Sequence, residues 1–281
     1  MSSDAKNTII EQHIDITDEI IQQNLNALDL LTAESGLSKQ KVKDAMSKGA
    51  VWLSASATSK TAKPIRRKNA KLKAGNQLSF YYNAEVLNRT IAKPQLIDDL
   101  GDYSVWNKPY GVWSHGSKWG DHCAIGRLVE QHFDFQRQSF VVHRLDRAAN
   151  GLILIGHNKK AAKALAELFS ERSLEKIYRA TVEGKFAKNQ IIESPIDDKA
   201  AISHVSLINY DDKANQSLVE VKIETGRKHQ IRKHLASIGH PIIGDRLYGE
   251  VKSDEIDLQL TAFKLSFECP IEKQIKTYQL G

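Results

Sequence analysis

Cysteine is scarce in this chain, since only Cys123 and Cys269 occur among its 281 residues and they form no CxxC pair. Disulfide frameworks and cysteine-based zinc sites are therefore excluded as organising features of the fold, and we expect a reducing, cytoplasmic location. No apolar run approaches the roughly 20 residues that a membrane-spanning helix needs. The opening residues also lack a basic stretch followed by an apolar core, so we expect neither a membrane protein nor a secretory signal.

Charge is the first informative feature of the composition. Hydrophobic residues make up 41% of the chain and charged residues 26%, which is ordinary for a globular protein of one large domain, or of one large and one small. The formal net charge is +6, and eleven Lys or Arg residues fall between Lys39 and Lys73 against a single acid, Asp44. Such a block either forms a solvated face or binds nucleic acid, and charge alone does not decide between the two.

The N-terminal part of the chain predicts a small, basic domain over residues 1–93. Its first twenty or so residues have little pattern and predict a loose lead-in. Two short helices follow, the second with Ser38 as its N-cap and Gly49 as its stop signal. Two strands are predicted after them, at 51–53 and 78–82. We therefore expect an αα-β unit with a positively charged surface over residues 20–85.

A second domain is expected over residues 94–281, after a linker at 94–101. Strand patterns dominate there and fall at residues 151–156, 176–184, 202–209, 218–224 and 261–267. Helical patterns follow Asn158 and Arg227, but no regular alternation of strand and helix occurs. The sequence therefore predicts an α+β fold with a mixed, mostly antiparallel sheet and flanking helices.

Three segments of this second domain carry residues suited to chemistry. The loop 107–116 (NKPYGVWSHG) combines turn-forming and aromatic residues. The segment 141–156 sets HRLD and a polar turn between two apolar stretches, which places Asp146 at the mouth of the core. The segment 173–180 puts Tyr178 on the inward face of a strand. Taken singly, each segment also fits a structural role: a turn, a loop carboxylate bonded to backbone amides, or a core tyrosine.

A fourth segment, residues 225–249, opens a helix rich in basic and imidazole groups. Arg232 borders the buried face of that helix, where an unpaired charge is costly, so it requires a carboxylate partner. Asp146 and Asp245 are the two candidates. No metal is expected, because the i, i+4 spacing of a helical zinc site is missing from the histidines of this segment, His229, His234 and His240.

Together these segments resemble the signature of the RluA-type family of RNA pseudouridine synthases. The resemblance covers roughly residues 103–270. It is carried by the NKPYG loop, by HRLD with its turn and Gly151, by a Lys-x-Tyr-x-Ala strand at 176–180, and by GRKHQIRKH leading to GHPIIGDRLYG. Four motifs in this order are far more specific than any one of them. The turn after HRLD departs from the family, because it reads Ala-Asn-Gly where Thr-Ser-Gly is usual.

This resemblance implies that the protein converts uridine in RNA to pseudouridine without a cofactor, with Asp146 as the essential catalytic residue. Arg232 matches the position that pairs with this aspartate, and Tyr178 matches the residue that stacks on the uracil and assists proton removal from C5. Arg144, close to this aspartate in the sequence, is placed to fill the gap left by a flipped uridine or to hold a phosphate. The N-terminal unit is distantly similar to the small αα-β RNA-binding fold that precedes the catalytic domain in many such synthases. Further RNA contacts are expected from polar residues of the motifs and of the basic block: Asn107, Lys108, His143, Arg227, His229, Arg66 and Arg67.

The substrate and two other interpretations stay open at this point. Ribosomal RNA is favoured because of the appended basic domain, transfer RNA is the alternative, and a monomer is expected. A protein that kept the fold and RNA binding but lost catalysis would fit the altered turn, since Ala149 and Asn150 lack the family's hydroxyls. A metal-dependent hydrolase that uses the histidines with Asp146 or Asp245 fits less well because of the histidine spacings.

Overall fold

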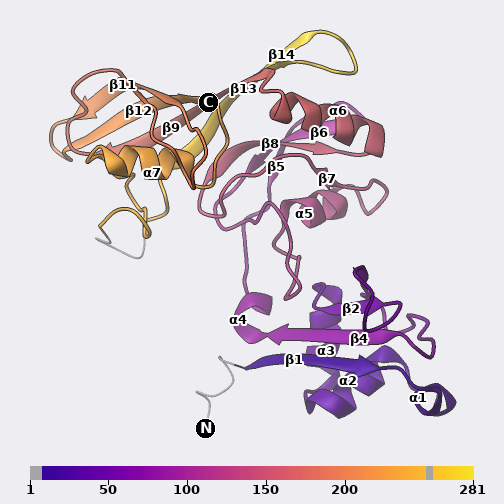
Figure 1. Cartoon of the computed structure of the whole chain (residues 1–281). Helices are drawn as coiled ribbons and strands as arrows, with labels where there is room; N and C mark the ends of the chain where they lie inside the picture. The colour runs from indigo at the N-terminus through magenta and orange to yellow at the C-terminus, as the bar shows by residue number, and fades with distance from the viewer. Residues whose placement is uncertain (1–7, 251–255) are drawn as a thin grey trace. The chain divides into compact units, whose positions relative to one another are not determined.

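The computed structural model describes residues 8–250 and 256–281, and the chain divides into two compact units (Figure 1). Unit 1 comprises the described residues as far as Thr90 together with His115–Ala124, and unit 2 comprises Ile91–Ser114 and the described residues from Ile125 onward. The chain therefore leaves unit 2 after Ser114 and returns to it at Ile125. The sequence did not predict that residues 115–124 belong to unit 1. An independently folding domain that ends at residue 93 stays a prediction.

Unit 1 is built on a four-stranded antiparallel sheet. Its strands are β1 (Ile9–Asp15), β2 (Val51–Ser54), β3 (Ala62–Pro64) and β4 (Gln77–Asn83), and its helices are α1 (Asp18–Gln22), α2 (Ala27–Ser35), α3 (Lys39–Ser47) and α4 (Ala84–Leu87). The strand order is β1-β4-β2-β3. The predicted loose lead-in was wrong where β1 lies, because β1 pairs with β4 along its whole length, and residues 1–7 fall outside the described part. Ser38 caps α3 as expected, accepting a hydrogen bond from the Lys41 N–H at 3.4 Å.

The segment 115–124 belongs to unit 1 through two kinds of contact. The Trp119 ring meets the Tyr81 ring edge to face, with centroids 5.7 Å apart. The Asp121 carboxylate forms an ion pair with the Arg66 guanidinium. An aromatic contact and an ionic one thus fix the segment to residues that precede it by several strands and helices.

Unit 2 contains a ten-stranded sheet. Its strands are β5 (Gln95–Asp99), β6 (Tyr103–Lys108), β7 (Phe140–Val141), β8 (Asn150–Gly156), β9 (Leu174–Glu183), β10 (Gln190–Ile192), β11 (Ser203–Asp211), β12 (Gln216–Ile223), β13 (Leu260–Glu268) and β14 (Ile275–Gln279), and its helices are α5 (Ile125–His132), α6 (Lys159–Ser170) and α7 (Gln230–Ser237). Eight strands follow the order β10-β11-β12-β9-β13-β8-β6-β5, with β14 beside β13 and β7 beside β8. Among the described strands, only β8 and β13 pair in parallel. The predicted α+β fold with a mixed, mostly antiparallel sheet is confirmed.

The expected linker at 94–101 was wrong, because most of it forms β5, which pairs with β6. This strand lies at the edge of the sheet, and its residues alternate between exposed and half-buried. An edge strand of this kind buries little apolar surface, so its hydrophobic signal in the sequence is weak.

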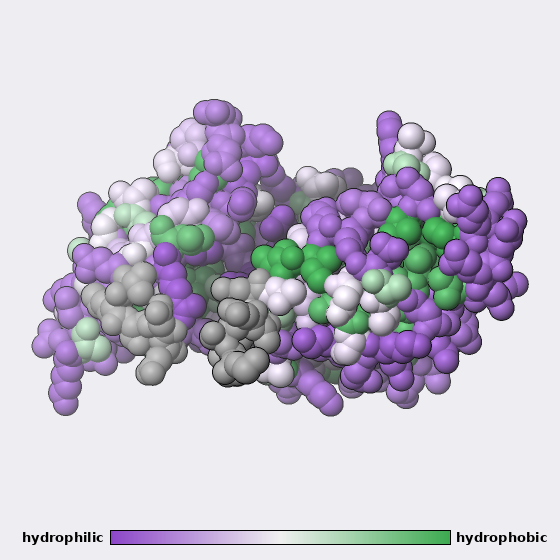
Figure 2. All heavy atoms as spheres, turned by 90° about the horizontal axis from the view of Figure 1, so that it is seen from below, coloured by the Kyte–Doolittle hydropathy of each residue, from purple (hydrophilic) through white to green (hydrophobic). Residues whose placement is uncertain are grey.

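Apolar side chains gather inside each unit. Residues 152–155 of β8 are fully buried, and α6 packs on this strand, with its Ala161 and Leu165 side chains buried. The surface seen in Figure 2 is mostly hydrophilic, and hydrophobic residues form small islands on it. Among the described residues, no helix combines the length and the apolar character needed to cross a bilayer.

Gly151 lies where β8 meets β13. Its φ is +117°, and a Cβ at this position would come within 2.4–2.8 Å of the backbone of Ala262. A side chain here would therefore push apart the parallel pair of β8 and β13, which begins just after the turn of residues 146–149. Glycine is required for the backbone conformation and for the close approach of the two strands.

We predict that Gly151→Ala lowers the free energy of unfolding by about 2–5 kcal/mol, because overpacking adds to an unfavourable backbone conformation. Urea denaturation of the full chain measures this loss. Gly101→Ala is the matched control, since Gly101 also has a positive φ of +74° but no atom lies within 4 Å of a Cβ there. Gly101→Ala should lower the free energy of unfolding by only about 1–2 kcal/mol, the cost of a left-handed backbone conformation for alanine. Equal losses in the two variants would contradict the steric argument.

Candidate active site

A pocket of about 220 Å³ opens in unit 2 beside Asp146. Segments far apart in the chain line it: the loop ahead of β8, the strand β9, the entry to α7 and the start of β13. The lining residues include Arg144, Asp146, Ala149, Tyr178, Arg227, His229, Arg232 and Leu260. The structure therefore brings together the three residues that were predicted to be catalytic, Asp146, Tyr178 and Arg232.

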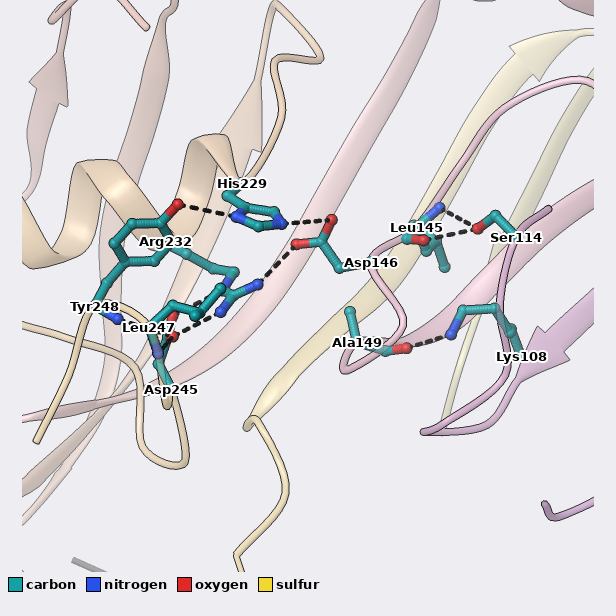
Figure 3. A network of polar contacts seen from close by, with 10 residues as sticks. All are labelled: Lys108, Ser114, Leu145, Asp146, Ala149, His229, Arg232, Asp245, Leu247 and Tyr248. Atoms are coloured by element: carbon teal, nitrogen blue, oxygen red, sulfur yellow. Dashed lines mark hydrogen bonds and ion pairs between the residues drawn. The ribbon is translucent and has the colours of Figure 1, made fainter. Parts of the chain in front are cut away.

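Arg232 is held by two carboxylates from different loops (Figure 3). Its Nε and Nη2 donate to the two carboxylate oxygens of Asp245 at 2.8 and 2.7 Å, which makes a bidentate pair. Its Nη1 lies 3.4 Å from Oδ2 of Asp146. The sequence left both aspartates open as partners of Arg232. In the structure Asp245 is the partner within short hydrogen-bond distance, and Asp146 is farther away. The Asp146 side chain keeps 18% of its surface exposed, against 0% for Asp245, so Asp146 is the carboxylate that a ligand can reach.

Asp245 is a buried anion that balances Arg232. Burial raises the pKa of the Asp245 carboxyl, but hydrogen bonds from Arg232 and from the backbone N–H groups of Leu247 and Tyr248 outweigh this effect and hold the pKa below its ordinary value. The two backbone bonds measure 2.9 and 3.2 Å. The turn that follows Asp245 is therefore folded around its carboxylate, and the carboxylate in turn fixes the plane of the guanidinium.

His229 occupies the N-cap position of α7 with a left-handed backbone, φ +56°. Its Nδ1 lies 2.9 Å from the Tyr248 hydroxyl oxygen, and its Nε2 lies 3.8 Å from Oδ1 of Asp146. Burial lowers the pKa of His229, although the Asp146 charge opposes this, so the imidazole is neutral at neutral pH. Non-glycine residues in this backbone region are uncommon and cluster at functional sites.

Tyr178 faces the pocket from β9. Burial of the phenol and the negative charge of Asp146 both raise the pKa of Tyr178 above its ordinary value, so the hydroxyl stays protonated at neutral pH. Ala180 and Val182, on the same face of the strand, are buried. The ring thus offers a neutral aromatic surface beside a carboxylate, which suits stacking against a planar base.

Lys108 was predicted to contact RNA, and this is wrong. Its side chain is 0% exposed, and its Nζ donates to the carbonyl oxygens of Ala149 at 2.6 Å, Val112 at 3.0 Å and Pro109 at 3.2 Å. Burial lowers the pKa of Lys108 to about 7, with the Asp146 charge opposing. The lysine therefore holds the end of the turn that begins at Asp146 and is closed off from any ligand.

Two further predicted RNA contacts lie elsewhere in unit 2. The His143 ring stacks on Phe169 with centroids 4.1 Å apart, and its Nε2 accepts a hydrogen bond from the Leu154 N–H at 2.9 Å. Burial lowers the pKa of His143 to about 3, so the ring is neutral, but the residue is half-buried and its RNA contact stays a prediction. Asn107 lines a separate hollow with Asn150, and its Oδ1 is buried.

The basic residues predicted to contact RNA differ in how accessible they are. Arg144 is exposed where it lines the pocket, and Arg227 lines it while its Nε donates to the Ala200 carbonyl oxygen at 3.1 Å. In unit 1, Arg66 is engaged with Asp121 and with the Ser47 carbonyl oxygen. Arg67, its neighbour, is exposed. The structure thus favours Arg67 over Arg66 as a residue that can meet a phosphate.

The altered turn after HRLD is braced without hydroxyl groups of its own. The Ala149 carbonyl is bound by Lys108, and the Asn150 Oδ1 accepts a hydrogen bond from the Thr261 hydroxyl at 2.7 Å. The Asn150 side chain thus links the end of the turn to β13.

Sequence reasoning missed two contributions to this site. Asp245 was named as a possible partner of Arg232, but the hydrogen bonds that it accepts from its own turn were not foreseen, and Tyr248 was not singled out. The available signal was the position of Asp245, since an aspartate in a turn commonly accepts from backbone N–H groups two and three residues ahead. No group of three or more His, Cys, Asp or Glu side chains that could hold a metal ion occurs within the described ranges.

Known proteins resemble this chain in sequence. Residues 102–237 match the family described as RNA pseudouridylate synthase. The chain is 34% identical over 184 residues to an uncharacterized RNA pseudouridine synthase of Zymomonas mobilis, which covers 59% of this chain and 83% of that protein. It is 32% identical over 174 residues to tRNA pseudouridine synthase C of Yersinia pestis, with 53% and 67% of the two chains covered. Several other relatives are matched over only 52% to 58% of their own length.

A solved structure, human RNA Pseudouridylate Synthase Domain Containing 1, has the same fold. It superposes with a TM-score of 0.59 at 22% identity, over 69% of this chain and 85% of that one. The fold, the order of the motifs and the identity to the Zymomonas protein agree with one another. The chain belongs to the RluA-type family of RNA pseudouridine synthases.

Proposed function

We propose that this protein converts specific uridines of structured RNA to pseudouridine and that Asp146 is essential for the reaction. The observation that carries the proposal is an accessible carboxylate in a pocket, 3.4 Å from a guanidinium whose orientation is fixed by Asp245. The guanidinium is a fixed positive charge beside this carboxylate and, at 3.4 Å, leaves most of its lone pairs free for a ligand. Asp146 is therefore suited to act on a bound nucleoside.

The reaction breaks the bond between C1′ of the ribose and N1 of the uracil and forms a bond between C1′ and C5. The proton on C5 leaves and N1 gains one, so the nucleotide keeps its composition and no electrons are gained or lost. We assign Asp146 the role of anionic nucleophile or base towards the ribose, with Arg232 as its charge partner. The pocket is small enough that the target uridine must be flipped out of the RNA, at a cost of a few kcal/mol.

Tyr178 is assigned to contact with the detached uracil. Its phenol is neutral at neutral pH, since burial and the charge of Asp146 both raise its pKa. A neutral phenol is a poor acceptor for the C5 proton, so stacking is the better-supported of the two roles that the family resemblance implies. Removal of the C5 proton is left to an anionic group, and Asp146 is the one carboxylate among the described residues that line the pocket.

Basic side chains at the pocket are suited to hold the RNA backbone. Arg144, Arg227 and Lys228 line the pocket, and the first and last of these are exposed. Lys and Arg contacts to phosphates give affinity and position without reading sequence. Unit 1 adds exposed basic residues of its own, among them Arg67 and Lys68, and we propose that it contributes to RNA binding.

Ribosomal RNA is our first candidate substrate, because a separate basic unit suits a large folded RNA. Transfer RNA is the second candidate, since one relative carries the name tRNA pseudouridine synthase C. A pseudouridine map of both RNA classes, from cells with and without the gene, distinguishes them by the class in which a site disappears. We also propose that the protein acts in the cytoplasm, because Cys123 and Cys269 are buried free thiols.

Asp146→Asn should abolish pseudouridine formation, with a loss of about 10⁴-fold or more, because an amide cannot act as the anion. Fold and RNA binding should persist, since Asn has nearly the same size and the phosphate contacts come from Lys and Arg. Release of label from C5-tritiated RNA gives the activity, and a filter-binding assay gives the affinity. Asp212→Asn, at an exposed position, is the control for an amide substitution outside the site. Turnover comparable to the wild type would refute the assignment of Asp146.

Arg232→Met should lower the free energy of unfolding by about 3–5 kcal/mol, because it leaves the buried Asp245 carboxylate without its charge partner. The pKa of the Asp245 carboxyl is lower in the folded protein than in the unfolded chain. The ionised carboxylate therefore stabilises the wild type at any pH above the unfolded-state pKa. This stabilisation is lost as the pH falls through the folded-state pKa. Arg232→Met should lack that acid-dependent loss. Urea denaturation at several pH values measures both effects.

The double variant Arg232→Met/Asp245→Leu is the control for this prediction. Replacing a whole buried ion pair by apolar residues is often neutral, so most of the stability should return, although Asp146 still lacks its charge partner. If the single variant were as stable as the wild type, the pair would contribute nothing to the fold.

Replacing Arg67, Lys68 and Lys71 together by Ala should weaken RNA binding and reduce its salt dependence. Each lost phosphate contact lowers the slope of log K against log salt by about 0.7–0.9, while kcat at saturating RNA should be unchanged. The matched control removes the same charge from α6, where Lys159, Lys160 and Lys163 are exposed and line no part of the pocket. Identical salt slopes in the two triple variants would show that unit 1 contributes no specific share of the binding.

A further inference from the structure

One hydroxyl group holds the backbone of the residue before Asp146 (Figure 3). The Ser114 Oγ accepts a hydrogen bond from the Leu145 N–H at 2.9 Å and donates one to the Leu145 carbonyl oxygen at 2.7 Å. Both residues are 6% exposed, and Leu145 belongs to no strand or helix. Buried backbone N–H and carbonyl groups need hydrogen-bond partners. Here the Ser114 hydroxyl supplies both the acceptor and the donor that a neighbouring strand would otherwise provide.

The loop that carries Ser114 also holds the chain after Asp146. The Gly111 N–H donates to the Arg147 carbonyl oxygen at 2.9 Å, and Lys108 Nζ donates to that of Ala149. The backbone on both sides of Asp146 is therefore fastened to residues 108–114. Ser114 is the attachment immediately ahead of the aspartate.

The contacts of the Asp146 side chain are too long to orient it. Its oxygens lie 3.4 Å from Arg232 Nη1 and 3.8 Å from His229 Nε2, and charge-assisted hydrogen bonds that fix geometry are nearer 2.7–2.9 Å. The direction of the carboxylate must therefore come mainly from the backbone that carries it. That backbone is set on its N-terminal side by Leu145, whose side chain is packed in the core.

We propose that Ser114 is a positioning residue for the reaction: by fixing Leu145 it sets the direction in which the Asp146 carboxylate faces the bound nucleoside. Ser114 does not line the pocket, so it acts through the backbone and not by touching the substrate. This proposal rests on the proposed role of Asp146.

A purely structural role for Ser114 predicts lost stability and nothing more, and Ser217 provides the matched comparison. It is 0% exposed, and its Oγ accepts from the Phe186 N–H at 2.9 Å and donates to the Gly184 carbonyl oxygen at 2.8 Å. It lies on β12, four residues before the Val221 that pairs with Tyr178. The chemistry of its two hydrogen bonds is the same as that of Ser114, but its partners carry no residue of the pocket.

The experiment compares Ser114→Ala with Ser217→Ala in the full chain, by thermal unfolding and by steady-state pseudouridine formation on an RNA that the wild type modifies. Both variants should unfold at a Tm lower by a few degrees. Ser114→Ala should lose about 10- to 100-fold in kcat with KM unchanged, because displacement of a reacting group by about 1 Å has effects of this size. Ser217→Ala should keep its kcat. Ser114→Thr, which restores the hydroxyl, should recover most of the loss.

Equal kcat values for the two Ala variants at equal loss of Tm would overturn the proposal, and so would an effect of Ser114→Ala confined to KM. If Ser114→Ala does not fold, Ser114→Cys replaces it, since a thiol keeps the volume and weakens both hydrogen bonds. Its kcat must then fall below that of Ser217→Cys. If the wild type modifies no RNA, the proposed function itself is refuted. If the wild type forms pseudouridine and the Ser114 variant does so equally well, only the role of Ser114 is refuted.

Discussion

The bidentate pair between Arg232 and Asp245 is the interaction on which the candidate site depends. Burying these two charges is costly, and such a pair adds little net stability compared with apolar residues of similar size. Its value lies in direction: with two of its nitrogens bound by Asp245, the guanidinium has a single orientation, and its third nitrogen faces Asp146. The Asp245 carboxylate thus has a structural role, and the Asp146 carboxylate stays accessible to a ligand.

The two aspartates show how environment divides the work of identical side chains. Asp245 accepts four hydrogen bonds, two from the guanidinium and two from backbone N–H groups, and has no exposed surface. Asp146 lies on a turn fastened from behind by residues 108–114, and its oxygens have only long contacts with positively charged or imidazole groups. The hydrogen bonds of Asp245 occupy its acceptor positions, whereas the long contacts of Asp146 leave its oxygens available to a substrate.

Local patterns in the sequence predicted the fold well, and long-range packing set the limit. The apolar run of β8 and the capping Asn158 of α6 depend on neighbouring residues alone, so these elements were correctly expected. The edge strands β1 and β5 bury little and were missed. Motif order identified Asp146 and its neighbours in the pocket, but it also assigned Lys108 to RNA. A lysine that faces three carbonyl groups and one that faces a phosphate look the same in a sequence, because the difference lies in what the fold places around the ammonium.

The excursion of residues 115–124 means that the chain passes between its two units three times: after Thr90, after Ser114 and after Ala124. A domain joined at one junction can be exchanged between genes by a single recombination event. Here unit 1 is built from two stretches of the chain, and the second stretch, residues 115–124, is ten residues long and lies inside the sequence of unit 2. Trp119 and Asp121 must remain compatible with Tyr81 and Arg66, which are encoded far upstream. A single exchange at Thr90 would therefore separate Trp119 and Asp121 from the Tyr81 and Arg66 side chains that they contact.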